Sequence, residues 1–89
     1  MTRILIVEDN VILATTLVRF LRGYAKVNVC AVVPTAERAL AKIRQFPVDL
    51  VLVDIALPGM SGIDLIALLH KEYPNLPCLV LSAHDEIVY

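Results

Sequence analysis

Short apolar runs alternate with amphipathic stretches along most of the chain. The β-branched, apolar runs predict four strands, at residues 3–7, 26–33, 49–54 and 78–82. Between them, apolar side chains recur at helical spacing and predict three helices, at residues 11–22, 35–46 and 61–72. Strands and helices that alternate through connections of a few residues favour an α/β domain whose parallel sheet carries helices on both faces.

Helical spacing also predicts which side chains point inward. In the first two helices these are Leu13, Leu17, Phe20 and Leu21, and Ala36, Leu40, Ile43 and Phe46. Asp9 or Asn10 can cap the first helix, and Ser61 with Asp64 forms a capping-box pattern before the third. The lysine and asparagine of 26–33 favour an edge position for that strand.

Composition and charge narrow the class of protein. The 89 residues suffice for one small domain, and 58% of them are hydrophobic, above the usual 45–50%. Either the core is unusually rich in apolar residues, or part of the apolar surface is covered by something outside this sequence. Residues 1–48 hold seven Lys/Arg and three Asp/Glu, against one and six in residues 49–89. No arginine-rich stripe with interleaved aromatics occurs, so direct nucleic-acid binding by this segment is not expected.

Cysteine usage and the apolar runs favour a cytoplasmic protein. There are two cysteines without metal-ligand spacing, Cys30 and Cys78. The sequence predicts no membrane span, because no apolar run approaches about 18 residues.

Polar side chains end three of the predicted strands. Glu8 and Asp9 follow the first, Asp54 ends the third, and the fourth ends in Ser82, Ala83 and His84. Sites in open parallel sheets form beyond the carboxyl ends of the strands. If the first and third strands are neighbours, these carboxylates converge.

Clustered carboxylates indicate a site for a hard divalent cation, for which Mg²⁺ is better suited than zinc. Mg²⁺ commonly bridges carboxylates and phosphate oxygens, and a carboxylate can itself act as a nucleophile and form an aspartyl phosphate. Each residue alone also has a structural interpretation. Asp54 can be a hydrogen-bonded strand end, Glu8 and Asp9 can serve the helix dipole, and Ser82 can cap a helix. Their occurrence together at three strand ends favours chemistry.

These residues resemble the receiver domain of bacterial two-component response regulators. The resemblance is carried by "ILIVEDN", by "DLVLVDIALPGMSGIDL" around Asp54 and by "CLVLSAHDE". Residues 25–72 look most like the LuxR-like subgroup, which continues into a helix-turn-helix DNA-binding domain. The resemblance implies a flavodoxin-like doubly wound sheet with strand order 2-1-3-4. This order separates Cys30 and Cys78 by roughly 14 Å, too far for a disulfide, so both should be free thiols. The resemblance covers residues 1–89 as one receiver domain that is incomplete at its C-terminus. A fifth strand and a fifth helix are expected to be missing, together with the lysine that ends that strand.

The same resemblance implies a role for each matching residue. Asp54 would accept a phosphoryl group from a sensor histidine kinase. Asp9, the Asp54 carboxylate and the backbone carbonyl of Ala56 would hold Mg²⁺, with Glu8 acting through water. Ser82 would hydrogen-bond the phosphoryl group and switch, and Ala83 would leave room for it.

The expected function is a switch, not an enzyme, that controls transcription through a DNA-binding output domain outside this sequence. An alternative is a phosphorylation-independent interaction module, since an exposed fourth strand would favour a homo-oligomer or a domain-swapped dimer. A Mg²⁺-dependent phosphohydrolase would place an acid two residues beyond Asp54, where this chain has Ala56. His70 is interpreted as a solvent-facing helix residue and His84 as part of a loop above the site.

Overall fold

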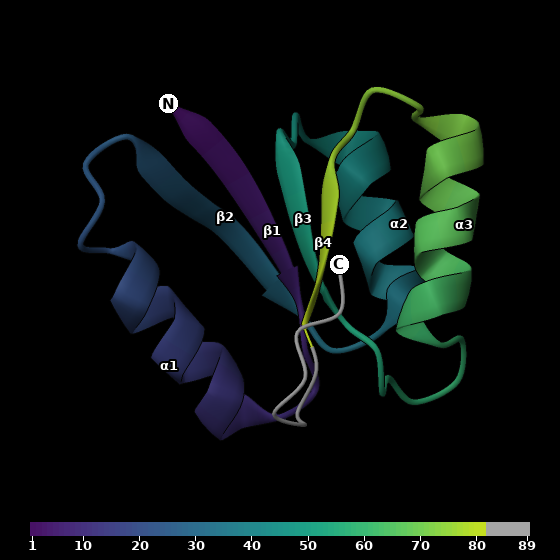
Figure 1. Ribbon diagram of the computed structural model, residues 1–89, viewed down its shortest axis with the longest axis horizontal. Helices are drawn as coiled ribbons and strands as arrows, with labels where there is room; N and C mark the ends of the chain where they lie inside the picture. Colours follow the sequence, from purple (N-terminus) through teal and green to yellow (C-terminus); the bar gives the residue numbers. More distant parts are fainter. Residues whose placement is uncertain (82–89) are drawn as a thin grey trace.

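The computed structural model describes residues 1–81, which alternate strictly between strands and helices (Figure 1). In chain order the elements are β1 (Thr2–Val7), α1 (Val11–Leu21), β2 (Val27–Val33), α2 (Ala36–Gln45), β3 (Leu50–Asp54), α3 (Gly62–Glu72) and β4 (Cys78–Leu81). Within the described range, each boundary lies within one residue of its predicted position. None of the helices in this range is long and apolar enough to cross a membrane.

The four strands form one parallel sheet in the order β2-β1-β3-β4, as predicted. Helix α1 covers one face of the sheet, and α2 and α3 lie together on the other (Figure 1). The doubly wound α/β architecture is therefore confirmed. Because β1 and β3 occupy the centre, their carboxyl ends lie side by side at one edge of the sheet.

Two apolar layers fix the central strands. Odd-numbered residues of β1 and β3, such as Leu5 and Val51, pack with α2 and α3 around Leu65. Even-numbered residues, such as Ile4, pack towards α1. Burial of each such side chain contributes about 1.5–3 kcal/mol, which explains why nearly continuous aliphatic runs form these strands.

Two predicted inward-facing side chains are instead exposed. Phe20 is 64% exposed and packs edge-to-face against Tyr24, with ring centroids 5.5 Å apart. Phe46 is 52% exposed because it follows the last residue of α2 with an extended backbone, φ −129°. The next residue, Pro47, disfavours helical geometry at the residue before it. The interpretation of Phe20 and Phe46 as core residues was therefore wrong.

The helix caps follow the sequence signals. Asn10 is the N-cap of α1, and its side chain accepts a hydrogen bond from the backbone N–H of Leu13 at 3.0 Å. Ser61 caps α3, and its Oγ accepts from the backbone N–H of Asp64 at 3.1 Å. Of the two candidates for the first cap, Asn10 is therefore the one used, which leaves Asp9 available for the site.

The edge strand β2 contains a bulge. Its pairing with β1 joins Ile4 to Val29 and then Leu5 to Ala31, so Cys30 is the extra residue. The Cys30 thiol donates to the carbonyl of Ile4 at 3.3 Å. Both cysteines are free, as expected for residues on strands separated by β1 and β3.

Candidate functional site

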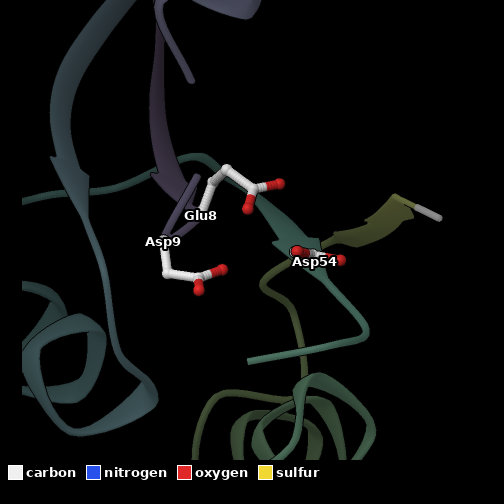
Figure 2. A group of neighbouring side chains, drawn as sticks. All are labelled: Glu8, Asp9 and Asp54. Atoms are coloured by element: carbon white, nitrogen blue, oxygen red, sulfur yellow. The ribbon is translucent and has the colours of Figure 1, made fainter. Parts of the chain in front are cut away.

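Three carboxylates meet at the carboxyl ends of the two central strands (Figure 2). Glu8 and Asp9 follow β1, Asp54 is the last residue of β3, and one oxygen from each lies within 4.8 Å of the others. Figure 2 shows the Glu8 and Asp9 carboxylates directed towards Asp54. The convergence predicted from the strand ends is thus observed for these three residues.

Glu8 is held by the backbone around it and is only 3% exposed. Its backbone N–H donates to the carbonyl of Val33 at 2.9 Å, which joins the ends of β1 and β2. Its Oε2 accepts from the backbone N–H of Asn10 at 3.0 Å. Its Oε1 is buried and has no hydrogen-bond partner among residues 1–81. A buried carboxylate oxygen without a donor is costly, so this atom favours a cation or a proton beside it.

Asp54 is fixed by the loop that follows it, and 6% of its surface is exposed. Its Oδ1 accepts from the backbone N–H of Ala56 at 3.1 Å. The N–H of Gly62, the first residue of α3, donates to the carbonyl of Ile55 at 3.1 Å. A Cβ on Gly62 would overlap the backbone carbonyl oxygen of Asp54, so only glycine permits this close approach.

The chain bends at the Pro58-Gly59 pair in the same loop. Gly59 has φ +74°, a conformation that side-chain-bearing residues rarely adopt. The chain can therefore leave β3, turn sharply and enter α3 beside the strand it has just left. This geometry keeps the Asp54 carboxylate at the open end of the sheet.

Electrostatics in the site depend most on Glu8. The pKa of Glu8 is raised from 4.5 to about 7, mainly by burial and further by the Asp54 and Asp9 carboxylates, while the hydrogen bond from the backbone N–H of Asn10 acts in the opposite direction. Near neutral pH, burial and, to a smaller extent, repulsion from Asp54 and Asp9 leave Glu8 only partly ionised. A divalent cation would offset that repulsion.

The donor set fits Mg²⁺. The clustered oxygens are hard ligands, the sidechain of Asp9 is exposed to solvent, and Mg²⁺ retains several waters when it binds to proteins. The carbonyl of Ala56 accepts no hydrogen bond from residues 1–81 and is available at the same end of the sheet. The unpartnered Oε1 of Glu8 is the observation that most favours a cation.

A groove of about 540 Å³ leads from the acidic residues along α1 and the end of β2. Glu8 and Asp9 lie at one end of it, Val32 forms part of its wall, and Arg19 and Arg22 add positive charge. Asp54 does not line this groove, which reaches the acidic cluster at Glu8 and Asp9.

The remaining predicted site residues divide into two groups. Ser82, Ala83 and His84 lie outside the described residues. His70 is exposed in the last turn of α3, as predicted. Sequence reasoning missed the close packing of Gly62 against Asp54, although a glycine directly after the Ser61 cap was the available signal.

Comparison with known proteins agrees with this geometry. Residues 4–89 match the family model of the response regulator receiver domain. The chain belongs to this family. The resemblance seen in the sequence is therefore confirmed, and the receiver fold places the acidic cluster where the strand order reverses.

Two relatives are longer than this chain. The chain is 38% identical over 81 residues to the two-component response regulator PhoP of Pseudomonas aeruginosa, covering 91% of the chain and 35% of PhoP. It is 38% identical over 86 residues to the DNA-binding response regulator MtrA of Mycolicibacterium paratuberculosis, covering 97% of the chain and 37% of MtrA. The chain thus spans about a third of the length of these relatives.

The fold is also found in a solved receiver domain. The isolated receiver domain of RcsB from Salmonella enterica serovar Typhimurium, determined with the phosphomimetic BeF₃⁻, superposes with a TM-score of 0.89. The match covers 96% of this chain and 64% of that one at 20% identity. This likeness supports the fold, and the chemistry of the present chain is argued from its own residues.

Proposed function

We propose that the chain is the phosphoacceptor switch of a two-component response regulator, with Asp54 as the residue that is phosphorylated. The observation that carries the proposal is the meeting of Glu8, Asp9 and Asp54 within 4.8 Å at the carboxyl ends of β1 and β3. Membership of the receiver family supports it. The Asp54 carboxylate lies at the carboxyl end of β3, where we expect a phosphoryl donor to approach.

The metal would be Mg²⁺, held by the carboxylates of Asp9 and Asp54 and the carbonyl of Ala56, with Glu8 acting through water. When bound, it would neutralise the acidic cluster and polarise the phosphoryl oxygens. The residues of the chain supply the rest. The N–H of Ala56 holds one Asp54 oxygen, which leaves Oδ2 as the nucleophile. In the family assignment, Ser82 would hydrogen-bond the phosphoryl group and Ala83 would leave room for it.

The reaction is a phosphoryl transfer from a phosphohistidine of the sensor kinase. An Asp54 oxygen forms a bond to phosphorus while the bond from phosphorus to the imidazole nitrogen breaks. The electron pair of that bond stays on the histidine, which then takes up a proton. Arg19 and Arg22 along the groove beside the site favour the approach of the negatively charged donor.

We infer that the signal passes to a DNA-binding output domain that regulates transcription in the cytoplasm. The naming of MtrA as a DNA-binding response regulator supports this role for the longer protein. In this proposal, the chain itself acts as a switch and contacts DNA only through that domain. Catalysis of repeated turnover is not part of the proposed function.

Acetyl phosphate or beryllofluoride with Mg²⁺ tests the assignment. Mass spectrometry should find one phosphoryl group on wild type after treatment with acetyl phosphate, at Asp54, and none after Asp54→Asn. Asp64→Asn, which changes an exposed aspartate on α3, is the matched control and should leave labelling intact. Labelling of Asp54→Asn equal to that of wild type would show that the phosphoacceptor is a different residue.

Self-association through the edge of β4 stays a prediction. Within residues 1–81, β4 pairs only with β3, and Leu79 on it is 49% exposed. Such an edge favours pairing with a second copy. Sedimentation equilibrium on wild type and Leu79→Lys measures it, with a dimer expected only for wild type.

A further inference from the structure

A second cavity lies far from the acidic cluster, between the C-terminal end of α2 and the start of β1 and β2. Its volume is about 200 Å³. The side chains that carry the inference are Arg3, Asn28, Cys30, Lys42 and Phe46. Arg3 stands near the beginning of β1, whereas Glu8 follows the end of that strand. The cavity is therefore at the opposite end of the sheet from Asp54.

The lining is positively charged and lacks acidic residues. It contains Arg3 and Lys42 but no aspartate or glutamate. Within residues 1–81 the one ion pair joins Arg44 to Glu72, so neither cation of the cavity is neutralised by a salt bridge there. Asp49 accepts a hydrogen bond from the backbone N–H of Arg3, but it does not line the cavity.

The rest of the wall is largely apolar. Phe46, Pro47 and Val48 form one side, where the chain leaves α2 for β3. The Lys42 ammonium lies 5.1 Å from the centre of the Phe46 ring, which places positive charge beside an apolar surface. Such a site combines an anion-binding group with a hydrophobic wall, as small-molecule sites commonly do.

We propose that this cavity binds a small organic anion, with its carboxylate between Arg3 and Lys42 and its apolar body against Phe46 and Val48. The size supports a ligand of one aromatic ring, since a cavity of about 150 Å³ holds benzene. The proposal does not depend on phosphorylation of Asp54, because none of the acidic cluster lines this cavity.

Cys30 provides a direct readout of occupancy. Cys30 lines the cavity, whereas Cys78 on β4 does not. Alkylation by neutral iodoacetamide, followed at each cysteine by mass spectrometry, should be slowed at Cys30 by at least about threefold in saturating benzoate. The rate at Cys78 should not change, which separates occupancy of the cavity from general stabilisation of the fold.

Matched ligands and variants test the chemical class. Benzamide, which has the ring without the charge, and inorganic phosphate, which has the charge without the ring, should both protect Cys30 less than benzoate. Lys42→Gln should lower the affinity for benzoate by about threefold, the effect expected for loss of a partly exposed ion pair. Lys71→Gln, on the last turn of α3, should leave the affinity unchanged.

Several results would overturn the proposal. If benzamide protected Cys30 as well as benzoate does, the negative charge of the ligand would play no part in binding. If phosphate did so, the apolar wall of the cavity would play no part. Protection of Cys78 together with Cys30 would point to a global effect. If Lys42→Gln does not fold, as judged by circular dichroism, Arg3→Gln takes its place, and unchanged benzoate binding in that variant would also refute the site.

Discussion

Replacing Glu8 with glutamine should make the metal-free protein more stable at neutral pH. Burial, together with the Asp54 and Asp9 carboxylates, raises the pKa of Glu8 from 4.5 to about 7. The folded state therefore binds a proton that the unfolded chain has already released at the same pH. The stability that this proton provides is fully present below pH 4.5 and is lost as the pH rises through 7.

The magnitude follows from the two pKa values. At about 1.36 kcal/mol for each pH unit, ionisation of Glu8 lowers the free energy of unfolding by at most about 3 kcal/mol above pH 7. About 2 kcal/mol of that loss falls between pH 5 and 7. For a domain of this size, such a change corresponds to a decrease in Tm of roughly 10 °C.

Urea unfolding in EDTA at several pH values between 5 and 7 measures the effect. Wild type should lose stability across this range, and Glu8→Gln should lose about 2 kcal/mol less because glutamine does not ionise. Glu37→Gln removes an exposed carboxylate on α2 and should keep the wild-type slope. If Glu8→Gln also keeps that slope, Glu8 does not hold a proton in the folded site.

Three other predictions concern the site and the core. Mg²⁺ at ten times its Kd should stabilise wild type at pH 8 by about 1.4 kcal/mol in urea unfolding, and much less in Asp54→Asn. Gly62→Ala should lower the free energy of unfolding by at least about 2 kcal/mol, because the added Cβ would overlap the Asp54 carbonyl. Gly23→Ala is the control, since a Cβ there would lie 3.4 Å from its nearest neighbour. An equal loss of stability in both variants would contradict the close packing of Gly62. Leu65→Ala should lower the free energy of unfolding by about 2–5 kcal/mol because Leu65 is fully buried, whereas Leu79→Ala should lower it by less than about 1 kcal/mol. Equal decreases in Tm for the two variants would argue against this assignment of the core.

The edge position of β2 could be predicted because residues 26–33 contain a lysine and an asparagine, whereas residues 3–7 and 49–54 are nearly all aliphatic. The full strand order followed from the family resemblance, because the aliphatic composition of β4 does not reveal that it also lies at an edge. Helical spacing wrongly predicted that Phe46 is buried. Phe46 continues that spacing, but Pro47 forces the backbone before it out of the helix, and the side chain leaves the apolar face.

The acidic cluster could be predicted from its place at strand ends, but its internal asymmetry could not. Glu8 and Asp9 are adjacent acids in the sequence, yet Glu8 is buried and Asp9 is exposed. This difference in burial depends on contacts with residues distant in sequence. They are the hydrogen bond from the Glu8 backbone N–H to the Val33 carbonyl and the proximity of Asp54. The cavity lined by Arg3, Cys30 and Lys42 could not be predicted either, because it joins residues from β1, β2 and the end of α2.

Because of the bulge at Cys30, the number of residues in the edge strand β2 affects the geometry of the acidic site. Before it, β2 pairs with β1 at a sequence offset of 25 residues, and after it at 26. The added residue sets the phase in which Val33 faces α2 and its carbonyl meets the N–H of Glu8. Deleting one residue from β2 would turn each later side chain to the opposite face. The position of Glu8 at the end of the central strand β1 therefore depends on whether the edge strand β2 contains an odd or an even number of residues.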